Sequence, residues 1–405
     1  MKPAPAGATS PAAHVEAGLA RRAAANERYF AAEAQRLARL CHRVAERFAR
    51  GGRLVAVGCS PAARSDVRHV AVEFVHPVIV GKRALPALGV TGEGSPLARQ
   101  LALLAEAEDI VLGFGGEEEV AAALVEVRAR GCLTVAFVPG SGAEWELAPE
   151  EEDPLVAQEL VEVLYHVLWE LVHVFFDHRG LLEGRDARSV HDSGASSFLY
   201  PFLGERETDL EAVLDDVRRS VLIKAEEIGA LREQTLGDGC EALIAAAAGL
   251  RGAFESGGKL LALGNGGSAT DATDAVAAFR TPHAGGPARP ALDLTEDPAI
   301  LTAIANDIGV EAIFARQVIA HGREGDALLA ISTSGNSTNV IAALAEARRR
   351  GLLTIAMVGY DGGRVAAEEL ADHVVVTRSE HIPRIQEAQA SAYHVLRELV
   401  EVAGE

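Results

Sequence analysis

The chain has 405 residues, 49% of them apolar, and a formal net charge of −20. This length exceeds what one hydrophobic core usually holds, so at least two domains are expected. The negative charge argues against nucleic acid and anionic membranes as partners, although it leaves room for a local phosphate-binding pocket.

Residues 1–14 are rich in proline, alanine and glycine and lack the apolar core of a signal peptide, which predicts a disordered leader. The four cysteines have no CxxC spacing, so free thiols in a reducing cytoplasm are expected rather than a structural metal knuckle. They are Cys41, Cys59, Cys132 and Cys240.

The first half begins with an amphipathic helical pattern at 21–50 and an apolar strand at 54–58, and further strands are predicted at 109–112 and 133–137. The loop at 113–119 reads Gly-Phe-Gly-Gly-Glu-Glu-Glu. Because three consecutive carboxylates would repel a phosphate dianion, no phosphate site is expected there.

The apolar stretch 155–176 contains too many polar groups to lie in a bilayer, so it predicts a buried or interface helix that closes a first domain at 15–177. Residues 178–207 contain glycine, serine and proline and predict a linker.

The second half, 208–405, repeats the same order of elements. A helical pattern at 210–254 precedes a strand at 260–264, and strands at 326–329 and 353–357 follow. Short apolar strands that alternate with helices predict an α/β fold with two tandem domains, each a doubly wound, three-layer arrangement of a parallel sheet between helices. Ligands of such sheets usually bind beyond the carboxyl ends of the strands.

Two Gly/Ser segments follow strands in the second half, and they have the composition of a phosphate cradle. Glycines let backbone N–H groups approach an anion, and hydroxyls donate further hydrogen bonds without adding charge. The alternative is that both are ordinary turns. The residues are Asn265, Gly266, Gly267 and Ser268 in one segment and Ser332, Thr333, Ser334 and Ser337 in the other.

Residues from about 210 to 402 resemble the phosphoheptose isomerase branch of the sugar isomerase (SIS) family. The resemblance rests on the motifs GNGGS at 264–268, Asn306-Asp307, STSGNS at 332–337, Asp361-Gly362-Gly363, and Arg384-Ile385-Gln386-Glu387 followed by His394. Gln386 and His394 are expected to line the substrate pocket. The resemblance implies that Ser268, Ser332, Thr333, Ser334 and Ser337 bind the substrate phosphate and that Asn265, Gly266, Gly267, Asn306 and Asp307 lie near the sugar. It further implies a zinc ion held by His, Glu, Gln and His.

The second half departs from the family at the first two metal positions, where Asp274 and Ala278 stand in place of the His-x-x-x-Glu pair. Alanine can neither coordinate a metal nor abstract a proton, so this half alone is catalytically incomplete. A non-catalytic SIS relative that binds the bacterial replication initiator also lacks the glutamate, which supports a rival function as a phosphosugar sensor or partner-binding protein.

The first half supplies the missing pattern. His69 and Glu73 have the family's spacing, and Gln158 and His166 match the separation of Gln386 from His394. The alternative is an interior histidine beside a solvated glutamate. We expect these four residues to form a zinc site, with Glu73 as catalytic base and His166 as acid or ligand, in a composite active site between the two domains.

The expected reaction is conversion of sedoheptulose 7-phosphate to D-glycero-D-manno-heptose 7-phosphate. Because single-domain isomerases of this family form tetramers, the two-domain chain is expected to form a homodimer.

Overall fold

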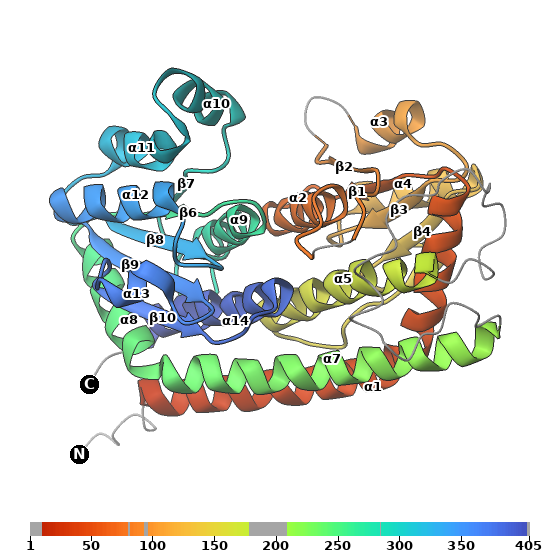
Figure 1. Cartoon of the computed structure of the whole chain (residues 1–405), viewed down its shortest axis with the longest axis horizontal. Coiled ribbons are helices and arrows are strands. Elements are labelled where there is room, and N and C mark those ends of the chain that lie inside the picture. The colour runs from red at the N-terminus through yellow and green to blue at the C-terminus, as the bar shows by residue number, and fades with distance from the viewer. Residues whose placement is uncertain (1–9, 80–81, 93–95, 178–208, 284, 403–405) are drawn as a thin grey trace, which may run out of the picture. The chain divides into compact units, whose positions relative to one another are not determined.

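The computed structural model describes residues 10–79, 82–92, 96–177, 209–283 and 285–402 (Figure 1). The chain divides into a unit of residues 25–226, called here the N-terminal unit, and a unit of residues 1–24 and 227–405, called the C-terminal unit. The division falls within helices α1 (Pro11–Ala49) and α7 (Leu210–Asp238). The domain limits expected from the sequence remain a prediction.

The two segments predicted to lack regular structure fall largely outside the described residues. The predicted linker, 178–207, lies there entirely, and so do residues 1–9 of the predicted leader. Residues 11–14 of that leader already belong to α1, and the His14 ring contacts Glu398 at 2.9 Å.

The N-terminal unit contains a parallel five-stranded sheet in the order β2 (Ala87–Val90), β1 (Leu54–Val57), β3 (Ile110–Gly113), β4 (Leu133–Ala136) and β5 (Trp145–Glu146). Its other helices are α2 (Pro61–Val75), α3 (Leu97–Leu104), α4 (Glu118–Ala129) and α5 (Pro154–Asp177). Alternate strand residues such as Val55, Val57 and Val111 form a core with α3 and α4. Helix α2 contacts both β1 and α5.

The C-terminal unit contains a second parallel sheet in the order β10 (His373–Thr377), β9 (Leu353–Gly359), β8 (Ala327–Ser332), β6 (Leu260–Leu263) and β7 (Ala291–Asp293). Its helices are α8 (Cys240–Glu255), α9 (Gly267–Arg280), α10 (Pro298–Asp307), the 3₁₀ turn η1 (Val310–Ala312), α11 (Ile313–His321), α12 (Thr338–Arg349), α13 (Gly363–Ala367) and α14 (Ile382–Glu401).

The central strands of this second sheet are buried on both faces, which explains their continuous apolar runs. Leu329 and Ile355 face a core shared with α8, α9 and α14. Leu328 and Ala356 face a core shared with α11 and α12. This confirms the α/β fold class, with helices on both sides of a parallel sheet (Figure 1).

In both units a basic residue just before the first strand of the sheet contacts an aspartate just before the neighbouring strand. In the N-terminal unit Arg53 donates from its backbone and its guanidinium to Asp109, at 2.8 Å each. In the C-terminal unit the backbone N–H of Lys259 donates to Asp326 at 2.9 Å, and the two side chains form an ion pair. The two units therefore share this contact and the same strand order, in agreement with the repeated order of elements in the sequence.

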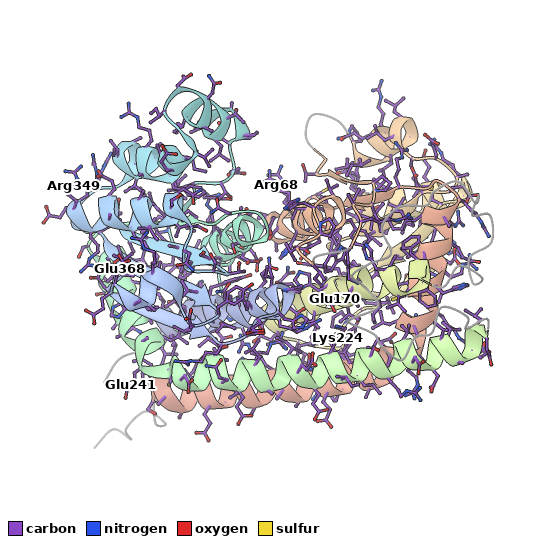
Figure 2. All side chains as sticks on the ribbon, in the orientation of Figure 1. Arg68, Glu170, Lys224, Glu241, Arg349 and Glu368 are labelled. Atoms are coloured by element: carbon purple, nitrogen blue, oxygen red, sulfur yellow. The ribbon has the colours of Figure 1, made fainter. Side chains whose placement is uncertain are left out.

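Helix α5 is buried along most of its length, and its buried side chains include the carboxylates of Glu159, Glu162 and Glu170. Glu170 forms an ion pair with Lys224 of α7 (Figure 2). Among the described residues, no helix is long and apolar enough to cross a membrane. All four cysteines are free, as predicted.

Candidate functional site

The two Gly/Ser segments follow neighbouring parallel strands of the C-terminal unit. Strand β6 ends at Leu263, beside β8, which ends at Ser332. The helices that follow, α9 and α12, have Gly266 and Ser337 as N-caps, and neither N-cap makes a side-chain capping hydrogen bond. Two helix N-termini therefore present backbone N–H groups at one edge of the sheet, which is a favourable place for an anion.

An amide pair joins the two segments. Asn265 Nδ2 donates to Asn339 Oδ1, and Asn339 Nδ2 donates to Asn265 Oδ1, at 2.9 Å in each direction. Asn339 is buried in the first turn of α12. The GNGGS segment is thereby fixed to the helix that follows the serine-rich segment.

The serine-rich segment uses its hydroxyl oxygens as acceptors within the loop. Ser332 Oγ accepts from the backbone N–H of Gly335, and Ser334 Oγ accepts from that of Asn336, both at 3.2 Å. Because a serine hydroxyl is both donor and acceptor, each O–H proton remains to be donated elsewhere, for example to phosphate oxygens. Ser332 is buried, whereas Thr333, Ser334 and Ser337 are half-buried.

A third loop, after β9, packs against this segment. The backbone N–H of Arg364 donates to Asn336 Oδ1 at 3.0 Å. Tyr360 adopts a left-handed backbone conformation with φ 53°, which is strained for a residue other than glycine. The loop helps to enclose a hollow of about 700 Å³ lined by Ser334, Asn336, Tyr360, Asp361, Arg378, Ser379 and Glu380.

Gly335 allows the close contact between these loops, and its replacement tests how much the cradle depends on it. It has φ 61°, and a Cβ there would lie 2.2 Å from the carbonyl oxygen of Gly362. We expect Gly335→Ala to lower the free energy of unfolding by about 2–3 kcal/mol or more, as measured by urea denaturation.

The matched control is Gly252→Ala on helix α8, where a Cβ would meet nothing within 4 Å. That variant should be more stable than the parent, by up to about 1 kcal/mol, because alanine favours the helix. Equal shifts in the two variants would contradict the assigned role of Gly335.

The other residues predicted to bind the substrate differ in their exposure to solvent. Asn306 and Asp307 are exposed at the end of α10, where Asn306 Nδ2 donates to Asp307 Oδ1 at 2.8 Å. Ser268 lies buried in the first turn of α9, and Gln386 lies buried on α14. Their roles in substrate binding remain predictions.

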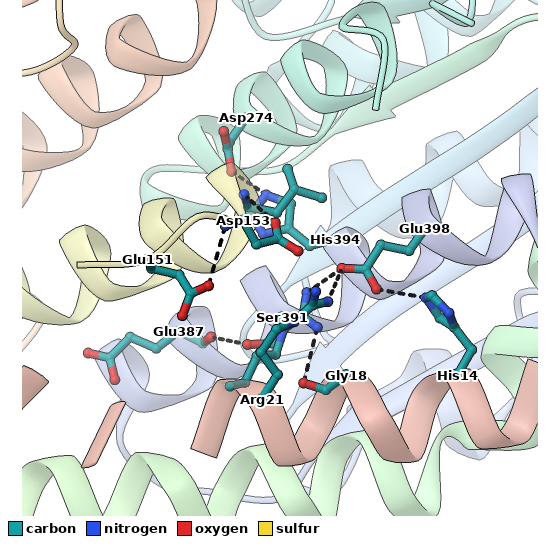
Figure 3. Close-up of polar contacts among 12 residues, drawn as sticks. His14, Gly18, Arg21, Glu151, Asp153, Asp274, Glu387, Ser391, His394 and Glu398 are labelled. Atoms are coloured by element: carbon teal, nitrogen blue, oxygen red, sulfur yellow. Dashed lines mark hydrogen bonds and ion pairs between the residues drawn. The ribbon is translucent and has the colours of Figure 1, made fainter. Parts of the chain in front are cut away.

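Asp274, which stands in place of the family's first metal-binding histidine, has its own polar partners within the C-terminal unit. Asp274 Oδ2 lies 3.1 Å from His394 Nε2 (Figure 3). The same oxygen accepts a hydrogen bond from the Tyr393 hydroxyl at 2.8 Å. All three side chains are buried. Asp274 is therefore stabilised by groups of its own unit.

The N-terminal unit brings together three of the four predicted metal ligands. His69 and Glu73 lie one turn apart on α2, His166 lies on α5, and all three are buried. One ligand atom from each lies within 4.8 Å of the others. The His69 and His166 Nε2 atoms are 3.3 Å apart, and His69 Nε2 is 3.9 Å from Glu73 Oε1.

This cluster fits a divalent metal ion. Two nitrogens each about 2.0–2.1 Å from a tetrahedral ion lie about 3.3 Å from one another, which is the separation of the two imidazoles here. Burial lowers the pKa of His69 well below its usual range, and the neighbouring His166 lowers it further. The imidazole therefore stays neutral, as a metal ligand must be.

The fourth predicted ligand, Gln158, donates from Nε2 to Asp66 Oδ1 at 2.7 Å. Its role as a ligand remains a prediction. At the start of α4, within the stretch that the sequence predicts to be a loop, Glu119 accepts a hydrogen bond from the backbone N–H of Leu97, and Glu118 is exposed.

Two kinds of residue in these clusters are not among those predicted from the sequence. Asn339 has no local signal, because its partner lies 74 positions away. Tyr165 and Tyr393 could have been found, since the run Tyr-His-Val-Leu occurs at both 165–168 and 393–396.

Comparison with known proteins shows which family this chain resembles. The SIS domain model matches residues 225–359. The phosphoheptose isomerase of Chlorobium phaeobacteroides is 43% identical over 204 residues, covering 49% of this chain and 85% of that protein. That of Desulfovibrio desulfuricans is 50% identical over 146 residues, covering 36% of this chain and 69% of that protein.

Among solved structures, the C-terminal domain of glucosamine-fructose-6-phosphate aminotransferase from Francisella tularensis has a TM-score of 0.59 at 11% identity. The match covers 97% of this chain and 98% of that chain, and at this identity it concerns the fold alone. The predicted fold of two SIS-type α/β domains is confirmed. Since the chain also covers most of a relative with which it is 43% identical, it belongs to the phosphoheptose isomerase family of SIS-domain proteins.

Proposed function

We propose that the chain is an aldose–ketose isomerase that converts sedoheptulose 7-phosphate to D-glycero-D-manno-heptose 7-phosphate. The observation that carries this proposal is the pair of joined loops after β6 and β8, whose hydroxyls and helix N-termini suit a phosphate dianion. Relatives at 43–50% identity are named phosphoheptose isomerases, which supports the same substrate class.

The proposed chemistry divides between the two units, as the sequence predicts. The C-terminal unit binds the phosphate. Glu73 of the N-terminal unit removes a proton from C1 of the ketose, and an enediol forms as the carbonyl oxygen at C2 gains a proton. Return of the proton to C2, with loss of the O1 proton, gives the aldehyde. His166 exchanges the oxygen-bound protons or binds a metal ion.

We propose zinc as that ion, held by His69, Glu73 and His166, with Gln158 as a further predicted ligand. Zinc would polarise the substrate oxygens. The two buried imidazoles at 3.3 Å support this proposal, because neutral histidines are preferred zinc ligands. If Glu73 binds the ion, it must exchange that role with proton transfer during turnover.

The test is incubation of purified protein with sedoheptulose 7-phosphate, with added zinc or with a chelator, followed by NMR detection of the aldose product. We expect turnover with zinc and a marked loss after chelation. Turnover that survives complete metal removal would refute the zinc proposal and leave the isomerase proposal standing. No turnover on any heptose or hexose phosphate would refute the isomerase.

The second candidate is a phosphosugar sensor or partner-binding protein without turnover. It is favoured by Asp274 and Ala278, which replace the family's metal-binding pair in the unit that holds the phosphate loops. Calorimetric binding of a phosphosugar without conversion would identify this function. The homodimer expected from the resemblance remains a prediction.

A further inference from the structure

In each unit one tyrosine contacts the first residue of the segment that corresponds to the family's His-x-x-x-Glu pattern. In the N-terminal unit the Tyr165 hydroxyl lies 3.0 Å from His69 Nδ1. In the C-terminal unit the corresponding Tyr393 hydroxyl donates to Asp274 at 2.8 Å. Each tyrosine directly precedes the histidine that approaches the same central residue, His166 and His394 respectively.

The two arrangements differ in what the central residue can offer. Asp274 is an acceptor: its Oδ2 atom accepts a hydrogen bond from the Tyr393 hydroxyl and also faces His394 Nε2. His69 has two ring nitrogens with separate contacts: Nδ1 faces Tyr165, and Nε2 faces His166 and Glu73. The Nε2 atom of His69 therefore points into the cluster that fits a metal, while Nδ1, on the other side of the ring, contacts the Tyr165 hydroxyl.

We infer that Tyr165 is a positioning residue that orients the His69 ring and accepts its Nδ1–H when Nε2 binds a divalent metal ion. This inference rests on the metal site of the proposed function. The hydroxyl suits the task because it can rotate to accept a hydrogen bond, and Tyr165 is buried, so water does not readily replace it. Ring contact also fixes the geometry, with the Tyr165 and His69 centroids 5.4 Å apart.

Removal of the hydroxyl should act on metal binding more than on packing. Without it, the neutral His69 favours the tautomer with the proton on Nε2, because a buried N–H that loses its acceptor is costly. In that tautomer the proton must move from Nε2 to Nδ1 before Nε2 can bind a metal. Partners of this kind usually contribute 10- to 100-fold to metal affinity.

The experiment compares Tyr165→Phe with Tyr393→Phe in the full chain. Zn²⁺ affinity is measured by competition with a chromogenic chelator, and the visible absorption of the Co²⁺-loaded protein reports on the ligand geometry. We expect Tyr165→Phe to bind Zn²⁺ about 10- to 100-fold more weakly and to alter the Co²⁺ bands. Tyr393→Phe should stay within about twofold of the parent in Zn²⁺ affinity, with unchanged Co²⁺ bands.

Thermal unfolding of the metal-free proteins separates positioning from a general loss of stability, since each variant loses one buried hydrogen bond. The inference is wrong if both variants weaken Zn²⁺ binding equally, if Tyr165→Phe binds Zn²⁺ like the parent, or if the parent binds neither ion. Isomerase assays on the same samples keep this result separate from the proposed function, because turnover by the parent would stand in each of these cases.

Discussion

Glu73→Gln is expected to reduce the turnover number for sedoheptulose 7-phosphate by about 10²- to 10⁴-fold, since loss of a positioned general base has effects of this size. The amide nearly preserves the side-chain volume, and Glu73 belongs to the N-terminal unit rather than to the phosphate loops. Phosphosugar affinity measured by calorimetry should therefore be retained. His166→Ala should lower the activity and the zinc content together.

Two matched substitutions of carboxylate by amide control this prediction. Glu159→Gln changes another buried glutamate of the N-terminal unit and should keep most of the activity. Asp274→Asn makes the same chemical change in the C-terminal unit. If Asp274→Asn abolished turnover while Glu73→Gln isomerised normally, the proton transfer would belong to the C-terminal unit and the proposed division of chemistry would be wrong.

Ser334→Ala is expected to raise the dissociation constant for phosphorylated sugars by about 10- to 150-fold, because a hydrogen bond to a charged group contributes about 1.5–3 kcal/mol. The half-buried Ser334 lines the hollow beside the serine-rich segment, so the change should leave the fold intact. Isothermal titration with sedoheptulose 7-phosphate measures the effect directly.

Glu118→Ala provides the control, because Glu118 is exposed at the start of α4, directly after the corresponding loop of the N-terminal unit, where no phosphate site is predicted. Its dissociation constant should match that of the parent. Unchanged affinity in both Ser334→Ala and Ser332→Ala would remove the serine-rich segment from the phosphate site.

Much of the fold and of the candidate cluster could be predicted because the signals are local or repeated. Residues at i and i+4 share a helix face, which is why His69 and Glu73 point the same way on α2. The repeat then predicts the place of His166 by comparison with His394. Continuous apolar runs likewise marked the strands of both buried parallel sheets.

The remaining features depend on packing between elements far apart in the sequence. Nothing near Asn339 indicates that its amide pairs with Asn265, because the pairing follows from the register of β6 beside β8. The surroundings of Asp274 were also beyond prediction, since Tyr393 reaches it from a helix 119 positions away. A missing histidine was evident from the sequence, but the network that stabilises its replacement was not.

The reciprocal amide pair between Asn265 and Asn339 also bears on the thermodynamics of ligand capture. Because it holds the GNGGS segment against α12 through contacts of the protein alone, the loss of conformational entropy on ordering these loops falls on folding and not on association. A phosphosugar that reaches one loop meets the other already in place. Loss of the pair would therefore appear as a larger unfavourable entropy of binding, even where the enthalpy of the phosphate contacts is unchanged.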